Sequence, residues 1–301
     1  MTLRALTLAV TRVRAQRRTA DFVVLTKPRV VLMVLVTTLV GFHVGSVGAS
    51  DPLRLLHALI GTGLAAAGSL ALNQFLERDV DGRMERTRRR PLPDKRLQPK
   101  EALYFGLALT LAGPTYLGLT INWLSAVVVT VTAASYLLAY TPLKRHSSLC
   151  TVLGAIPGAL PPVTGWVAAR GEFGVGAWVL FGILFLWQLP HTLAIAWVYR
   201  RDYARADLRM LPVVDPEGAS TCRQVIINCL ALFTVGLLPS LVGITGPVYF
   251  LGALVLGAAM LACGIALAMT RSMGDARRLV YASLVYLPAL FVLMAVDKIR
   301  F

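Results

Sequence analysis

Nine apolar runs of roughly 20 residues follow one another along the 301-residue chain, and a helix of that length can cross a bilayer. The runs cover residues 29–48, 56–78, 101–120, 123–141, 150–168, 176–199, 223–243, 248–270 and 279–297. Inside lipid, backbone N–H and C=O groups must pair within the protein, so spanning segments of this length form helices. The sequence therefore predicts an all-α polytopic membrane protein with nine transmembrane helices.

The distribution of basic residues predicts the orientation of this bundle. If the N-terminus is placed in the cytoplasm, 26 of the 30 Lys and Arg residues fall on the cytoplasmic side. The four exceptions are Arg54, Arg170, Lys298 and Arg300. Such an excess is typical of cytoplasmic loops. We therefore expect a cytoplasmic N-terminus, an external C-terminus, a basic cytoplasmic arm over residues 1–28 and a single transmembrane domain over residues 29–301.

A net charge of +15 is also common in nucleic-acid-binding proteins. Here the basic residues flank apolar segments instead of clustering on a soluble domain, and 56% of all residues are hydrophobic. This pattern excludes nucleic acid as a partner and favours the lipid bilayer.

Prolines interrupt several of the apolar runs. Five of them should kink their helices: Pro114, Pro157, Pro190, Pro239 and Pro288. We expect the Pro161–Pro162 pair to end a half-helix and to leave backbone groups pointing into a cavity.

The stretch from Asn73 to Pro93 is the most informative polar segment. Asn73, Glu77 and Asp81 are spaced four residues apart, so they share one face of a helix. Asp79 lies off that face. Three oxygen-bearing side chains in a row suit Mg²⁺, and the arginines that follow suit phosphate groups. A solvated loop with simple ion pairs explains the arginines, but it does not explain polar groups that directly follow an apolar run.

A second polar segment follows the sixth apolar run. Asp202 supplies a carboxylate there, with Tyr199, Arg200 and Tyr203 beside it. The second and sixth runs both end in such stretches, which hints at a duplicated four-helix unit with two facing half-sites. An ordinary surface loop is the alternative, and it is our preferred interpretation of Asp207.

Two further elements face the same side of the membrane. Lys144 and Arg145 are the basic residues of the loop after the fourth run, and we expect them to stabilise a departing anionic leaving group. His191 lies within the sixth run. The sequence leaves open whether it is a packed core residue or contacts a substrate or a haem iron.

Taken together, these motifs resemble the protohaem IX farnesyltransferase (haem O synthase) family of the UbiA-type intramembrane prenyltransferase superfamily. The resemblance rests on LNQFLERDVDGRMERTRRRPLP, YTPLKR, GAIPGALPPVTGW, WQLPH…AIAW and YRRDYARA…MLPVV, in that order. It covers nearly the whole chain from about residue 22. The family usually has glycine where this chain has Asp207, and an asparagine commonly stands near the position of Cys150.

The resemblance implies a fold, a reaction and a site. The nine helices would surround a central cavity opening to the cytoplasm in a bacterial inner membrane. A farnesyl group would pass from farnesyl diphosphate to a vinyl group of haem B, with water addition, giving haem O for a downstream haem A synthase. The implied Mg²⁺ ligands are Asn73, Glu77, Asp81 and Asp202, which with Lys144 form the catalytic set. The implied substrate-binding residues are Arg78, Arg86, Arg90, Arg145, His191, Tyr199, Arg200 and Tyr203.

Two alternatives remain open from the sequence. A sibling enzyme that prenylates a small aromatic acid or a quinone precursor would share the metal site, but it would need a dedicated partner for the acid. A transporter with paired half-sites would carry isolated charges at mid-membrane. The clustered Asn, Glu, Asp and Arg residues argue against the transporter.

Overall fold

The computed structural model describes residues 18–299 and is built of helices in that range. Their bounds are α2 (Pro28–Gly45), α3 (Pro52–Asp81), α4 (Pro99–Thr120), α5 (Trp123–Ala134), the π-helix η1 (Ser135–Tyr140), α6 (Thr141–Leu143), α7 (Cys150–Arg170), α8 (Val175–Val198), α9 (Arg200–Arg205), α10 (Leu211–Val214), α11 (Ala219–Gly236), α12 (Leu238–Leu241), α13 (Pro247–Thr270) and α14 (Met273–Val296). Residues 18–25, before α2, are also helical. Within the described range, nine helical segments are long and apolar enough to cross a membrane, which confirms the predicted number.

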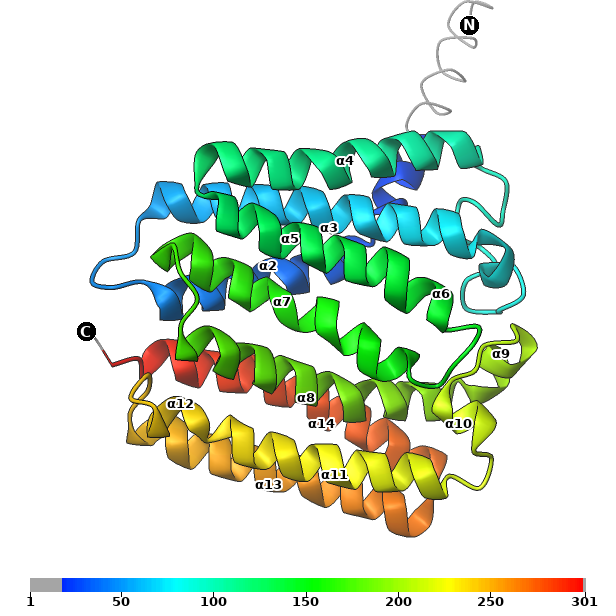
Figure 1. Ribbon diagram of the computed structural model, residues 1–301. Coiled ribbons are helices and arrows are strands. Elements are labelled where there is room, and N and C mark those ends of the chain that lie inside the picture. The colour runs from blue at the N-terminus through cyan, green and yellow to red at the C-terminus, as the bar shows by residue number, and fades with distance from the viewer. Residues whose placement is uncertain (1–17, 300–301) are drawn as a thin grey trace, which may run out of the picture.

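The long helices lie roughly side by side in one bundle (Figure 1). In the first half, α3 packs on α4, and α4 packs on α5. In the second half, α8 packs on α11, and α11 packs on α13. The halves meet mainly where α7 packs on α2 and α8, while α14 closes against α8 and α13. This repetition of neighbours is the one expected for a duplicated four-helix unit.

The two polar loops lie at the same end of the bundle, together with α6, α9 and α10 (Figure 1). We call this the loop-rich end. One contact between the loops is a hydrogen bond from the Glu85 backbone N–H to the Asp202 carboxylate, at 3.4 Å. Val80 and Met84 also pack on Ala206 and Leu208. The fold therefore brings both predicted half-sites to one end of the bundle.

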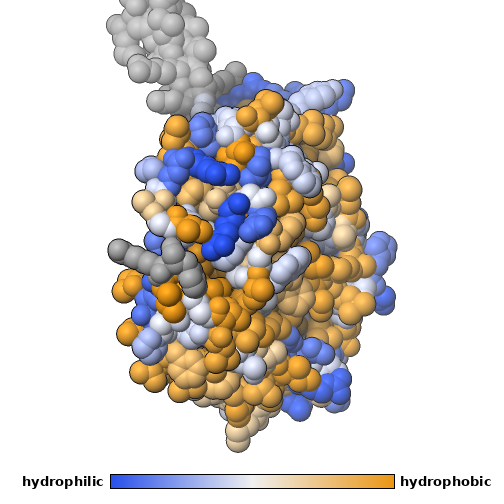
Figure 2. Space-filling view, turned by 60° about the vertical axis from the view of Figure 1, so that its left-hand side comes forward, coloured by the Kyte–Doolittle hydropathy of each residue, from blue (hydrophilic) through white to orange (hydrophobic). Residues whose placement is uncertain are grey.

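The face of the bundle seen in Figure 2 is largely apolar. Leu111, Leu119 and Val255 are 66%, 83% and 68% exposed, and many other large apolar side chains on the long helices are exposed too. Such a surface is stable against lipid tails but not against water. The chain is therefore a multi-pass membrane protein.

The expectation that Pro161–Pro162 would end a half-helix is wrong. Helix α7 continues through both prolines to Arg170. Each proline removes one backbone hydrogen bond, and neighbouring groups in a packed membrane helix tolerate that loss. Pro157, Gly158 and Pro161 line an internal cavity, so the prolines still shape its wall.

Candidate active site

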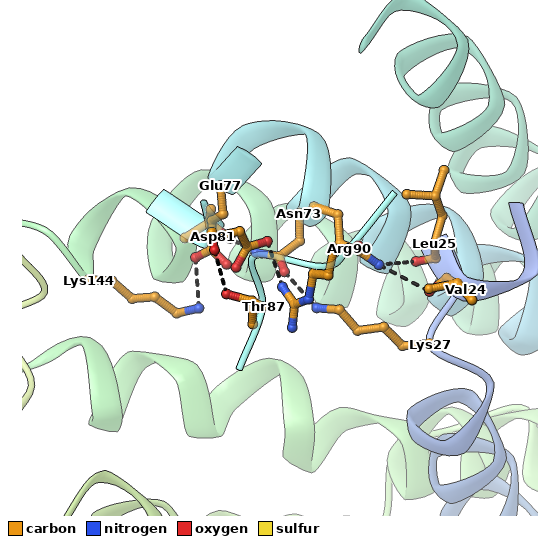
Figure 3. A network of polar contacts seen from close by, with 11 residues as sticks. Val24, Leu25, Lys27, Asn73, Glu77, Asp81, Thr87, Arg90 and Lys144 are labelled. Atoms are coloured by element: carbon orange, nitrogen blue, oxygen red, sulfur yellow. Dashed lines mark hydrogen bonds and ion pairs between the residues drawn. The ribbon is translucent and has the colours of Figure 1, made fainter. Parts of the chain in front are cut away.

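The last three turns of α3 present three oxygen-bearing side chains at the loop-rich end (Figure 3). Asn73, Glu77 and Asp81 share one helix face, as their spacing predicted. Asn73 and Asp81 are only 1% and 4% exposed. Burying an unpaired carboxylate costs several kcal/mol, to order of magnitude, so these oxygens need partners.

Each of the three oxygens is met by a cation from a different segment of the chain (Figure 3). The contacts are Lys27 Nζ to Asn73 Oδ1 at 2.9 Å, Lys144 Nζ to Glu77 Oε1 at 2.8 Å and Arg90 Nη1 to Asp81 Oδ2 at 2.6 Å. We call these six residues the α3 cluster. Its cations come from the residue before α2, the residue after α6 and the loop after α3, so the cluster exists only in the folded chain.

Hydrogen bonds from neighbouring residues hold the α3 cluster in place. The Asn73 amide donates to the Thr141 hydroxyl at 3.2 Å, and the Thr87 hydroxyl donates to the Asp81 carbonyl at 2.8 Å. Gln74 Nε2 donates to the Leu25 carbonyl at 2.9 Å. This last bond fixes the segment that leads into Lys27.

Lys27 reaches the cluster through an unusual backbone conformation. Its φ of 48° and ψ of 66° lie in the left-handed region, and Pro28 then begins α2. A proline disfavours the right-handed helical conformation in the residue before it. Burial and the nearby Arg90 lower the pKa of Lys27 to about 7. The ammonium group is therefore close to its titration point at neutral pH.

Lys144 behaves differently. Burial disfavours its charged form, but the oxygens of Tyr140 and Glu77 outweigh burial and raise the pKa of Lys144 well above its ordinary value. Its Nζ also lies 4.4 Å from the centre of the Tyr140 ring. Lys144 is thus a permanent positive charge at this site.

The donor set of the α3 cluster fits a hard divalent cation. One amide oxygen and two carboxylates converge, and each already binds a positive charge of the chain itself. Mg²⁺ is commonly held by one or two carboxylates, with other oxygens completing its shell. Among residues 18–299, however, no three His, Cys, Asp or Glu side chains gather closely enough to hold an ion. The structure therefore does not bring Asp202 together with Glu77 and Asp81, and its role as a ligand stays a prediction.

A partly open cavity of about 270 Å³, which we call the internal cavity, lies between the helices. Its lining is mostly apolar or small and includes Val34, Ser69, Leu70, Val129, Tyr136 and Tyr140. The π-helix η1 supplies both tyrosines, whose rings stack 5.5 Å apart. Ser69 lies one turn before Asn73 on α3, and Tyr140 lies under the Lys144 ammonium. The cavity therefore adjoins the α3 cluster.

A second hollow, of about 610 Å³, lies beside α9. Four arginines and two acids line it: Arg86, Arg200, Arg201, Arg205, Glu85 and Asp202. We call it the arginine basin. The structure thus places Arg86 and Arg200 in a basin distinct from the α3 cluster, whereas it places Arg90 and Lys144 within that cluster.

The remaining predicted substrate-binding residues have other surroundings. Arg78 donates to the Phe75 carbonyl of its own helix at 2.9 Å, and the Arg145 side chain is exposed. Tyr203 packs against apolar side chains of two small clusters, which include Val80 and Cys150. Neither cavity is lined by Arg78, Arg145 or Tyr203. Their part in substrate binding stays a prediction.

His191 is packed between helices. Its Nδ1 lies 2.6 Å from the Ser283 hydroxyl, and its ring stacks on Trp187 with centroids 4.8 Å apart. Gln188 and Thr192, on the neighbouring face of α8, line the internal cavity instead. Of the two readings that the sequence left open, this geometry favours the packed core histidine.

Lys27 was not predicted as a site residue, because the sequence places it only in the basic arm. A lysine directly before the proline that begins an apolar run was the available signal. That signal does not show that the side chain turns back towards Asn73, since the turn depends on contacts with α3.

The match to a known family is extensive. Residues 34–293 match the model of the UbiA prenyltransferase family. The chain is 48% identical over 287 residues to a protein named protoheme IX farnesyltransferase from Solibacter usitatus, covering 92% of this chain and 98% of that protein. It is 43% identical over 288 residues to a protein of the same name from Koribacter versatilis, covering 92% and 93%.

Solved structures agree on the fold. A digeranylgeranylglyceryl phosphate synthase superposes with a TM-score of 0.80 at 14% identity, covering 93% of this chain and 98% of that one. A UbiA homologue from Archaeoglobus fulgidus bound to DMAPP and Mg²⁺ superposes with a TM-score of 0.66 at 16% identity, covering 92% and 99%. At these identities the likeness concerns the architecture.

Proposed function

The chain belongs to the UbiA prenyltransferase family, and on that premise we propose that it transfers a farnesyl group from farnesyl diphosphate to a vinyl group of haem B. The observation that carries this proposal is the 48% identity, over nearly the full length of both chains, to a protein named for this reaction. The α3 cluster beside an apolar cavity supports it, since a prenyl diphosphate has one anionic head and one apolar tail.

In this proposal the diphosphate binds at the α3 cluster and the prenyl chain enters the internal cavity. Asn73, Glu77 and Asp81 would hold Mg²⁺, which supplies positive charge to the diphosphate as it leaves. Lys144 and Arg90 would bind phosphate oxygens of the same diphosphate. Asp202 lines the separate arginine basin, so it would have to approach the α3 cluster to act as a further ligand. Arg78, Arg145 and Tyr203 would have to turn towards the site to take part.

The reaction balances without an oxidant or a reductant. The C–O bond between the farnesyl group and the diphosphate breaks, and the diphosphate leaves with the electron pair. The vinyl group attacks the resulting allylic cation, and water adds to the new cationic carbon and loses a proton. The mainly apolar lining of the cavity would limit the access of other water to the allylic cation. The product is haem O, the substrate of a haem A synthase.

The orientation of the protein is part of the proposal. The excess of basic residues at the loop-rich end supports a cytoplasmic active site, a cytoplasmic N-terminus and an external C-terminus in a bacterial inner membrane. Reporter tags on the two termini should label opposite sides of the membrane. Labelling of both tags on one side would contradict this orientation.

One assay tests the reaction. The purified protein is incubated with haem B, farnesyl diphosphate and Mg²⁺, and the haem fraction is analysed by mass spectrometry. We expect a haem species that is heavier by a farnesyl group plus water, and none when Mg²⁺ is chelated. Unchanged haem from a folded protein, with prenylation of hydroxybenzoate or naphthoate, would favour the small-aromatic alternative.

A further inference from the structure

The arginine basin holds guanidinium groups that no carboxylate of the described residues neutralises. Both acids of the basin pair with Arg205, Glu85 at 3.1 Å and Asp202 in a closer contact. Within residues 18–299, the remaining three arginines of the basin form no ion pair: Arg86, Arg200 and Arg201. The basin therefore has spare positive charge and spare N–H donors.

Two of these arginines are held by aromatic rings. The Arg86 guanidinium lies 5.3 Å from the centre of the Tyr199 ring, and the Arg200 guanidinium lies 4.6 Å from the centre of the Trp197 ring. A ring covers the flat face of a guanidinium and leaves its N–H edge free. A guanidinium edge fixed in this way matches the two oxygens of a carboxylate.

The basin is separate from the α3 cluster but adjoins it. Glu85 and Arg86 follow Asp81 by about one turn of chain, and the Thr87 hydroxyl returns to the Asp81 carbonyl at 2.8 Å. One short segment thus forms a wall of the basin and supports the α3 cluster. The basin and the α3 cluster are therefore neighbouring sites that share the segment 85–87.

The two proposed substrates differ in their anionic groups. Farnesyl diphosphate carries a single diphosphate head, which the α3 cluster suits. Haem B carries two propionate carboxylates on one edge and its vinyl groups on the opposite side. If the propionate edge stays in the basin, the vinyl side of the ring points away from it.

We propose that the arginine basin binds the two carboxylates of the porphyrin acceptor, with Arg86 and Arg200 as their principal partners. This inference rests on the proposed function, because it takes the acceptor to be a dicarboxylate porphyrin. It assigns Arg86 and Arg200 to the acceptor instead of the diphosphate. It also gives the enzyme a way to select a porphyrin over a small aromatic acid, which has only one carboxylate.

The test compares a dicarboxylate porphyrin with its dimethyl ester. Zinc protoporphyrin IX, followed by its fluorescence, reports binding without turnover, and haem B and its dimethyl ester report KM. We expect Arg86→Gln and Arg200→Gln each to weaken binding of the diacid about ten-fold or more, since each removes a charge-assisted pair. The dimethyl ester should bind the wild type and both variants equally weakly. The KM for farnesyl diphosphate should not change.

Two further variants sharpen the comparison. Arg86→Lys keeps the charge but loses the planar fork and the stacking, so it should be nearly as weak as Arg86→Gln. Arg209→Gln removes an exposed arginine of the same loop that does not line the basin, and it should bind the diacid as the wild type does. Equal weakening in Arg209→Gln would mean that net charge alone attracts the porphyrin, which would overturn the proposal.

Other outcomes would also overturn it. A rise in the KM for farnesyl diphosphate, with porphyrin binding intact, would assign the arginines to the diphosphate. Weaker binding to vesicles containing anionic lipid, with porphyrin binding intact, would assign them to lipid headgroups. If the wild type binds the diacid through these arginines but produces no farnesylated haem, the assignment of the basin to the porphyrin carboxylates is kept and the proposed reaction is contradicted.

Discussion

The Lys144 ammonium lies 2.8 Å from the Glu77 carboxylate, although the two residues are 67 positions apart in the chain. Their side chains are only 15% and 14% exposed. The pair ties the end of α3 to the loop after α6, directly above the Tyr140 ring that lines the internal cavity. It therefore joins the mouth of the cavity to the α3 cluster.

Breaking this pair on one side should destabilise the protein more than removing both partners. Glu77→Gln and Lys144→Met each leave one buried charge without its partner, at a cost of about 3–5 kcal/mol. The double variant removes both charges, so its Tm in detergent should exceed that of either single variant. Asp207→Asn, which opens the exposed Arg83–Asp207 pair, should change Tm little. If the loss of Tm in the double variant equals the sum of the two single losses, Glu77 and Lys144 are not energetically coupled.

Turnover should depend on Asp81 far more than on its neighbour Asp79. Asp81 belongs to the α3 cluster, whereas the Asp79 side chain is 74% exposed and lies off that face. Asp81→Asn should lower kcat/KM by about a hundred-fold or more, because the proposed metal loses a charged ligand. Asp79→Asn should retain nearly wild-type activity. A matching loss in both variants, measured at equal membrane insertion, would remove the basis for choosing Asp81.

The Asp81 and Asp79 variants should also differ in how much Mg²⁺ and farnesyl diphosphate raise their Tm. Mg²⁺ and farnesyl diphosphate together should raise the Tm of the wild type, because a ligand that binds only the folded state stabilises it. At a ligand concentration of about 100 Kd the gain is roughly 2.7 kcal/mol. The gain should disappear in Asp81→Asn and persist in Asp79→Asn. An undiminished gain in Asp81→Asn would contradict the assignment of the diphosphate to the α3 cluster.

The sequence predicted the number of helices because hydropathy over 20 residues is a local property. The sequence was less accurate for the ends of helices whose first or last turn is polar. Helix α14 begins at Met273, although the apolar run was placed from 279. The first turn of α14 is polar, and it is stabilised by the Ser272 cap and by the ion pair between Asp275 and Arg278. Helix capping extends the helix beyond the apolar stretch that hydropathy detects.

The site was predicted as far as spacing along one helix allows. Asn73, Glu77 and Asp81 share a face because of the helical repeat, which the sequence displays directly. The cations that meet them come from distant segments, so Lys27 went unnoticed. The arginines near the site were recognised as a group, but their division between the α3 cluster and the arginine basin depends on tertiary packing. The sequence therefore predicted which types of charged residue belong to the site, but it did not predict which residue each of them pairs with.

Close packing of α2 on α7 should make two glycines intolerant of substitution. A Cβ added at Gly41 would lie 1.9 Å from the Pro162 carbonyl oxygen, and one at Gly165 would lie 2.0 Å from the Thr38 carbonyl oxygen. Backbone atoms cannot move aside easily, so alanine at either position should cost about 1–3 kcal/mol or more. Gly63→Ala is the control, since its Cβ would meet only the Leu35 side chain at 3.4 Å. Equal Tm values for all three variants would contradict the contact between α2 and α7.

Stability should depend on pH through Lys27, whose pKa burial lowers from an ordinary 10.5 to about 7. Below pH 7 the folded protein carries a buried charged lysine, so the cost of burial is fully present. Between pH 7 and 10.5 the unfolded chain binds more protons at this residue than the folded protein does. The free energy of unfolding therefore rises with pH in that window.

Comparison with Lys27→Met isolates this contribution. The difference in Tm between wild type and Lys27→Met should shift in favour of the wild type as pH rises from 7 to 9, since only the wild type loses a buried charge. Lys100→Met, at an exposed position, should show the same pH dependence as the wild type. If the difference between wild type and Lys27→Met stays constant over this range, Lys27 does not titrate near neutral pH in the folded protein.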